Sequence, residues 1–250
     1  PAYWSLDQRV DKGTARLGAT YRFTNRLYHR GDVSRQTAEA PPASVDNTYP
    51  ETSDAARGTL SWTPSARFSM LLSGGFSREE RESLAAPLAG SKTTDRGRVL
   101  GAFTFLLGKK TSITPSFAYF QNATTSAIAY RDDTGAIAAE TDIPYTDTAQ
   151  VGNLTLTHAA SDALTLTAEA GQAWLRGNYR SAAVVPGSAG IQNLRDLKSV
   201  ETIAGADVQL QFTKRLGSQF RYRFRKIDDI LDDAQDGTTQ LAFASLTFKW

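Results

Sequence analysis

Residues 66–77 read ARFSMLLSGGFS, and their apolar side chains recur at every second position. Phe68, Met70, Leu72 and Phe76 share one side of an extended chain, whereas mostly polar residues occupy the other. A strand from Phe68 to Phe76 is about 27 Å long at about 3.4 Å per residue. A tilt of about 40° reduces this to about 21 Å, close to the apolar band of roughly 25 Å in transmembrane barrels. This stretch therefore predicts a membrane-crossing β-strand.

The same two-residue period recurs along the whole chain, for example in RVLGAFTFLLG at 98–108. The pattern also predicts a weaker first strand, YWSLDQRV, at 3–10. The eleven clearer strands are expected at about 14–24, 27–35, 54–63, 66–78, 96–107, 111–122, 148–158, 163–175, 200–213, 218–227 and 238–250.

The connections between these strands alternate between short and long. Turn-forming residues fill the short set, at 24–26, 63–65, 108–110, 159–162 and 214–217. The long polar set lies at 36–53, 79–95, 123–147, 176–199 and 228–237. This layout predicts an all-β fold, a transmembrane antiparallel up-and-down β-barrel of about 12 strands, with residues 1–250 as one domain. Short turns are expected on the periplasmic side and long loops outside the cell. A soluble β-sandwich or propeller is the alternative, with shorter strands and a second layer that covers the apolar face.

Aromatic residues at both ends of the predicted strands indicate two membrane-interface girdles. The girdle at the short-turn end comprises Phe23, Trp62, Phe105, Phe212 and Trp250. The girdle at the long-loop end comprises Phe76, Tyr119 and Trp174.

Composition excludes several kinds of function. The chain has 28 basic and 26 acidic residues, no Cys and only two His, so thiolate metal sites and most histidine chemistry are improbable. His29 and His158 have no triad context, and the acidic segment 228–237 fails as an EF-hand because Ala234 and Phe243 occupy ligand positions. We expect no enzyme activity, no cofactor and no metal. Nucleic acid is not expected either, because the arginines and aromatics of 218–227 lie on opposite faces.

Alternation places Arg221, Arg223 and Arg225 together on the polar face, which would line the lumen of a barrel. Three interpretations are open: an anion-preferring channel, a surface for an acidic partner or plug, and internal salt bridges that close the lumen. The other predicted lumen residues are Arg16, Arg22, Arg57, Arg67, Arg98, Asp207 and Glu169.

The last residues, LTFKW at 246–250, resemble the C-terminal recognition strand of bacterial outer-membrane proteins. The resemblance implies a Gram-negative outer membrane, a cleaved signal peptide and recognition by the barrel-assembly machinery. It also implies the lipid bilayer and lipopolysaccharide as surroundings.

Residues 220–250, FRYRFRKIDDILDDAQDGTTQLAFASLTFKW, resemble the C-terminal end of the large MtrB/PioB-type porins that sheathe multihaem cytochromes. Those barrels are much longer, so the chain is either the C-terminal part of a longer barrel or a smaller porin. The expected function is passive diffusion of small, anionic solutes. The alternative is a structural barrel that holds a periplasmic or extracellular cytochrome for electron transfer.

Overall fold

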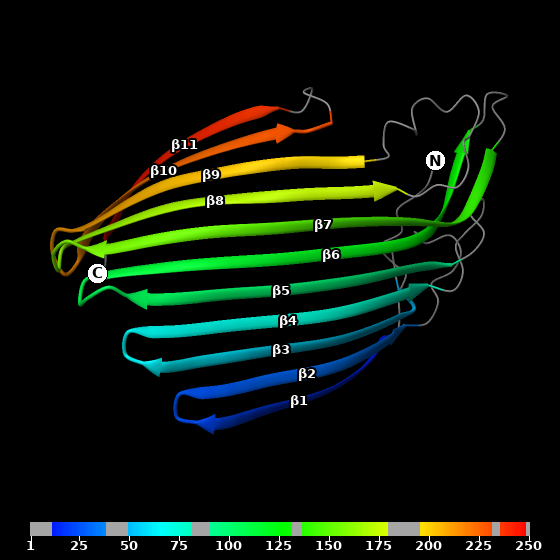
Figure 1. The fold of residues 1–250 in the computed structure, drawn as a ribbon, viewed down its shortest axis with the longest axis horizontal. Helices are drawn as coiled ribbons and strands as arrows, with labels where there is room; N and C mark the ends of the chain where they lie inside the picture. Colours follow the sequence, from blue (N-terminus) through cyan, green and yellow to red (C-terminus); the bar gives the residue numbers. More distant parts are fainter. Residues whose placement is uncertain are drawn as a thin grey trace.

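The computed structural model describes residues 12–38, 50–81, 91–131, 137–179, 196–231 and 236–248. These residues form one antiparallel sheet in which the strands follow one another in sequence order (Figure 1). Its eleven strands are β1 (Lys12–Thr24), β2 (Leu27–Ala38), β3 (Thr52–Ser65), β4 (Phe68–Arg81), β5 (Lys92–Leu106), β6 (Thr111–Arg131), β7 (Ile137–Ala159), β8 (Leu164–Tyr179), β9 (Asp196–Gln211), β10 (Leu216–Asp229) and β11 (Gly237–Phe248).

The predicted antiparallel, up-and-down order is confirmed. One predicted loop, 123–147, is wrong, because β6 and β7 continue through most of it and pair as far as Arg131 and Ile137. The two strands extend beyond their neighbours in Figure 1. A register shift between Ser126 and Ile128 interrupts the ladder, and a bulge of this kind bends a strand. Because β6 and β7 are longer than their neighbours, this hairpin projects past the rest of the sheet, and the bulge bends it.

Hydroxyl side chains stabilise the short turns. Thr24 Oγ1 accepts a hydrogen bond from the Arg26 amide at 3.1 Å, and Ser161 and Thr213 each accept from two amides that follow them. Such contacts favour a reversal of the chain. Gly108 has a φ of 144°, which suits glycine at a tight turn.

The turn predicted at 63–65 lies instead at 66–67, because β3 continues to Ser65. Pro64 has no amide hydrogen, and it lies where the β3–β4 register is irregular, between Trp62 and Ser65. The ladder tolerates a proline at such an irregularity.

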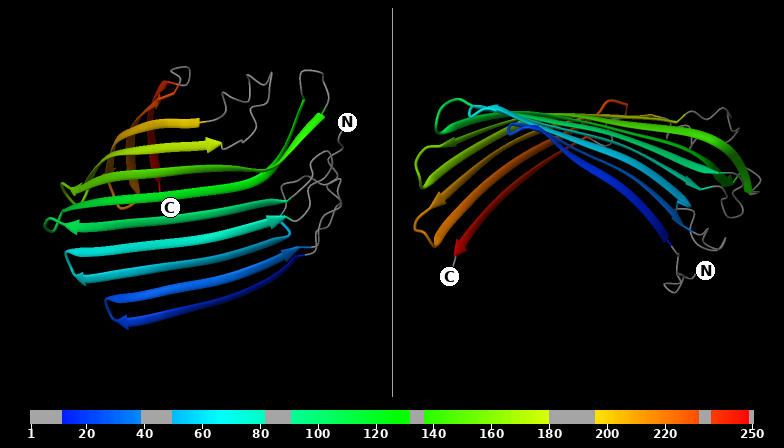
Figure 2. Two further views of the ribbon diagram at one scale, coloured as in Figure 1. Left: turned by 45° about the vertical axis from the view of Figure 1, so that its right-hand side comes forward. Right: turned by 90° about the horizontal axis from the view of Figure 1, so that it is seen from below.

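The sheet curves strongly, and within the described residues it does not close. Figure 2 shows an arch with β1 and β11 at opposite edges. In that part of the chain β1 pairs only with β2 and β11 only with β10. The predicted twelfth strand, 3–10, and Trp250 lie outside the described residues.

The described strands form a single layer, and each strand packs mainly against its sequence neighbours. Large apolar side chains such as Leu17, Phe76 and Leu246 are 74%, 52% and 70% exposed. A soluble sandwich would bury such residues between two sheets, so the single layer contradicts that alternative. The described residues contain no helix long and apolar enough to cross a membrane.

Candidate functional site

The polar face of the sheet is its concave face. A pocket of about 350 Å³ on this face is lined by residues from Arg57 of β3 to Leu197 of β9. In a flat sheet those two strands would be about 29 Å apart, at about 4.8 Å per strand. So small a pocket reaches both strands only if they curve around it. The polar side chains of these strands therefore line the inner side of the arch.

The three arginines of β10 lie on this concave face, and each is paired with an acid. Arg221 Nε lies 2.8 Å from Asp207 Oδ2 on the adjacent strand β9. Arg225 lies 2.5 Å from Glu201 Oε1, also on β9. The predicted stacking on one wall is therefore present as an ion-paired ladder.

The third pair depends on a glycine. Arg223 Nε lies 3.2 Å from Glu169 Oε1, although Glu169 is on β8, two strands away. Gly205 of β9 lies directly between them in the register. A Cβ atom on Gly205 would come within 2.6 Å of Glu169 Oε1. The missing side chain thus opens the path across β9 through which the ion pair forms.

A second group of concave arginines has no acidic partner among the described residues. We call these the free arginines. They are Arg22 of β1, Arg30 of β2, Arg57 of β3 and Arg98 of β5.

The free arginines lie diagonally across the first five strands. Arg30 is a diagonal neighbour of both Arg22 and Arg57 in the β1–β2 and β2–β3 registers. Arg57 and Arg98 flank Gly75, and each has a side-chain atom 3.4 Å from the position of a Cβ on that glycine. Asp32, directly opposite Arg57, pairs with another arginine, Arg16, at 3.1 Å. The four arginines form an exposed basic track.

The pocket next to Arg57 and Arg98 combines basic, polar and apolar groups. Its basic lining includes Arg96, which is paired with Glu79. Oδ1 of Asn122 and Oδ1 of Asp147 are buried without a hydrogen-bond partner among the described residues, and buried acceptors of this kind are normally satisfied. The apolar lining includes Phe120, Ala149, Leu175 and Leu197. The pocket thus offers donors, acceptors and an apolar surface together.

The structure places most, but not all, of the predicted lumen residues on the concave face. Those on it are Arg16, Arg22, Arg57, Arg98, Arg221, Arg223, Arg225, Asp207 and Glu169. Arg67 is the exception: it is exposed in the 66–67 turn. Its placement on the wall was wrong because the strand was expected to begin at 66, two residues before β4.

The charged residues of this face that sequence reasoning missed include Arg30, Arg96 and Glu201. Arg96 has the same parity as Arg98, and Glu201 the same parity as Asp207, so the alternation could have identified both. Arg30 lies in a strand with little apolar alternation, and only its register with β1 and β3 reveals its face.

The predicted girdle residues that the structure describes, all except Trp250, lie on the opposite, apolar face. At the short-turn end Trp62 packs edge-on against Phe68, with ring centroids 5.9 Å apart, and Phe68 lies 5.0 Å from Phe105. Phe23 is exposed near the end of β1, and Phe212 is exposed just after β9. At the long-loop end Tyr119 and Trp174 flank Gln150 in one cross-strand row, and Phe76 of β4 is 52% exposed.

Neither histidine lines the concave pocket. His158 Nδ1 lies 2.9 Å from Thr111 Oγ1 at the short-turn end of β7. His29 lies on the apolar face of β2, where its ring covers Gly31 and Gly58. No metal-binding group of carboxylates and imidazoles exists among the residues that the structure describes.

Comparison with known proteins identifies the fold. No family model and no curated protein matches the chain. Its sheet is similar to the FrpB iron transporter from Neisseria meningitidis (TM-score 0.65, 7% identity, 95% of this chain and 43% of that one). It is also similar to the ferric enterobactin receptor PfeA from Pseudomonas aeruginosa (0.63, 12%, 94% and 38%) and the outer membrane transporter YddB from Escherichia coli (0.62, 9%, 94% and 36%).

The fold is that of a bacterial outer-membrane barrel wall. The predicted outer-membrane location agrees with this fold. The chain spans less than half the length of the structures it matches. The three named structures are an iron transporter, a ferric enterobactin receptor and an outer membrane transporter. None of them is named as a porin that sheathes a cytochrome. The resemblance of 220–250 to such porins therefore stays a prediction.

Proposed function

We propose that the chain forms one side of a larger transport barrel in the outer membrane. Unpaired sheet edges do not occur in the hydrocarbon region, because their amide and carbonyl groups would have no partners there. The outer edges of β1 and β11 lack a partner strand among the described residues. Further strands must therefore complete the wall, and the length of the similar structures supports a barrel about twice this size.

The transported solutes are proposed to be small anions. The observation that carries this proposal is the basic track of Arg22, Arg30, Arg57 and Arg98, which is exposed on the concave face and has no acidic partner in the described part of the chain. Unpaired positive charge along a pore wall concentrates anions and repels cations. The ladder of β10 contributes less, because its three arginines are neutralised. Transport also agrees with the names of the similar structures.

Planar-bilayer recording of the assembled barrel, without any energy source, tests this function. A passive anion pathway should give stable conductance steps and a reversal potential that favours anions in a salt gradient. Cation-selective steps would refute the proposed solute class. A barrel that inserts and folds but gives no steps would refute passive diffusion and favour a plugged lumen or the cytochrome-sheathing alternative.

A further inference from the structure

The pocket beside Arg57 and Arg98 lies where two cross-strand rows of the concave face are adjacent. The first row is formed by Arg57, Gly75, Arg98, Phe120 and Ala149. The second row contains Asn122 and Asp147, which are register partners one alternation step nearer the long loops. Residues two apart on one face of a strand are separated by about 6.8 Å, at about 3.4 Å per residue. Positive charge, an aromatic ring and two oxygen acceptors are therefore within the reach of one small molecule.

The charges of the described pocket residues leave an excess of one positive charge. Arg96 and Glu79 neutralise each other, and the side chain of Arg176 is on the outer face of β8. Two free arginines of the pocket remain, and neither has an acidic partner among the described residues. Asp147 supplies the single opposing charge. Such a pocket complements a monovalent anion better than a zwitterion or a cation.

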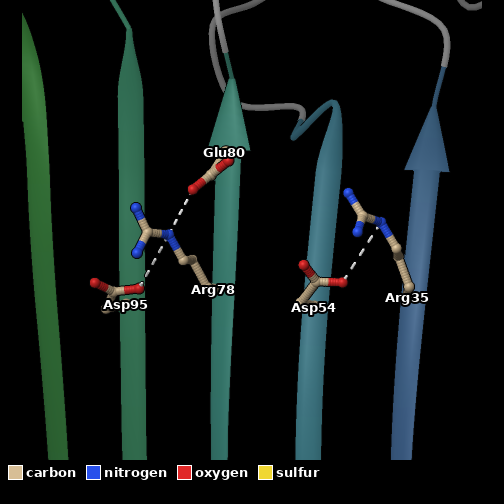
Figure 3. A network of polar contacts seen from close by, with 5 residues as sticks. All are labelled: Arg35, Asp54, Arg78, Glu80 and Asp95. Carbon is tan, nitrogen blue, oxygen red and sulfur yellow. Dashed lines mark hydrogen bonds and ion pairs between the residues drawn. The ribbon is translucent and has the colours of Figure 1, made fainter.

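The outer face of the same strands shows that charge is balanced elsewhere. Near the same height, four charged residues of β2 to β5 are consecutive register partners with alternating signs: Arg35, Asp54, Arg78 and Asp95 (Figure 3). Arg35 lies 3.8 Å from Asp54, and Arg78 lies 3.9 Å from Asp95. The excess positive charge is therefore a feature of the concave pocket rather than of these strands in general.

The two acceptors of the second row lack donors. Asn122 and Asp147 both line the pocket, and Oδ1 of each is buried without a hydrogen-bond partner in the described part of the chain. Buried acceptors are normally paired with a donor. A hydroxyl group on a bound molecule can supply one, and its oxygen can accept a hydrogen bond in return.

An apolar surface lies between the arginines and the far side of the pocket. Phe120 and Leu197 are 42% and 40% exposed, although they are on the otherwise polar concave face. Leu175 follows Ala149 in the first row and extends this surface. An apolar ligand that covers these side chains removes them from water, and an aromatic ring can also stack on Phe120.

We propose that this pocket binds an aromatic carboxylate that carries a hydroxyl group on the opposite side of its ring. The carboxylate accepts hydrogen bonds from the guanidinium groups of Arg57 and Arg98, the ring covers Phe120, and the hydroxyl donates to Asp147 or Asn122. The pocket volume of about 350 Å³ is near the lower end of small-molecule sites, roughly 300–1,000 Å³, which suits a single ring. This ligand class narrows the small anions proposed above and rests on that proposed function.

Isothermal titration calorimetry of the assembled barrel in uncharged detergent can test the site, with empty micelles as the blank. The probe is para-hydroxybenzoate. Three analogues each lack one feature: benzoate lacks the hydroxyl, para-hydroxybenzamide lacks the charge, and lactate lacks the ring. Each analogue should bind the parent about tenfold more weakly or worse, because one hydrogen bond, one charge-assisted contact or one apolar surface is lost.

Variants assign each feature to its residues. Arg57→Gln with Arg98→Gln should weaken para-hydroxybenzoate binding at least about tenfold. Lys214→Gln with Arg215→Gln removes the same charge at the exposed turn after β9 and should leave the affinity unchanged.

The hydroxyl contact has a test of its own. Asn122→Leu with Asp147→Leu removes both acceptors, so this variant should bind benzoate and para-hydroxybenzoate about equally. The readout is a ratio of two affinities, so it is insensitive to a general change in binding. Where this variant does not fold, the four compounds on the parent barrel still decide the hydroxyl contact.

Two results would overturn the proposal. One is equal affinity of the parent for benzoate and para-hydroxybenzoate. The other is a loss in the turn variant as large as that in the Arg57 and Arg98 variant, which would indicate general charge. Calorimetry needs no conduction, so a barrel that discriminates the four compounds but conducts no ions would support the site and refute passive diffusion. An anion-selective barrel that does not discriminate them would refute the site alone.

Discussion

Replacing Arg57 and Arg98 together with glutamine should weaken the anion selectivity that we propose for the assembled barrel. Both arginines are exposed on the concave face, and both approach Gly75 from the neighbouring strands. Neither forms an ion pair with a described acidic residue, so their charges act on the solution inside the barrel. An anion that passes Gly75 comes close to both arginine side chains. The glutamine variant retains a polar side chain at each position without the charge.

The size of the effect follows from Coulomb's law. One unit charge about 7 Å from a permeating ion contributes about 0.6 kcal/mol in water, and screening at about 0.1 M salt roughly halves this energy. Two arginines therefore contribute about 0.6 kcal/mol, favourable for an anion and unfavourable for a cation. Their removal should lower the anion-to-cation permeability ratio by about sevenfold. At about 1 M salt, where the Debye length falls to about 3 Å, the change should nearly vanish.

Reversal potentials of single channels in a salt gradient measure this ratio directly. The matched control is Arg96→Gln with Glu79→Gln, which removes a neighbouring pair that is already neutral and should leave the ratio unchanged. The reasoning is refuted if the Arg57 and Arg98 variant keeps the parent ratio at low salt, or if the control variant shifts it equally. Gel electrophoresis of unheated samples checks the fold. If the folded barrel of each variant migrates as the parent barrel does, neither variant has changed the fold.

Two further predictions concern packing and the ion-paired ladder. Gly101→Ala should lower the free energy of unfolding by about 1–3 kcal/mol, because its Cβ would lie 2.2 Å from the Phe117 ring; Gly97→Ala, on the same strand with open space around it, is the control. Equal urea midpoints for the two alanine variants would contradict this account. Asp207→Asn should leave the Arg221 charge without its 2.8 Å acidic partner and shift the reversal potential toward anions; a shift toward cations would contradict the interpretation of the ladder.

The two-residue alternation allowed much of the fold to be predicted. It gave the existence and order of all eleven described strands, and it placed residues as distant as Arg57 and Arg223 on the same face. This succeeded because a strand has only two faces and a short antiparallel turn preserves the order of strands. Strand ends were less predictable. Residues 123–131 and 137–147 are polar enough to be taken for a loop, but pairing between β6 and β7 keeps them extended.

The sequence by itself determined that this protein is a sheet with one apolar and one polar face, because side-chain direction depends only on local backbone geometry. Only the tertiary structure decided which arginines are neutralised. Arg223 reaches Glu169 because the registers of β8, β9 and β10 align both residues with Gly205. Arg57 and Arg98 are aligned with Gly75 instead, and neither pairs with an acid on any of the described strands. Register couples residues far apart in the chain, and the distribution of free charge on the concave face follows from it.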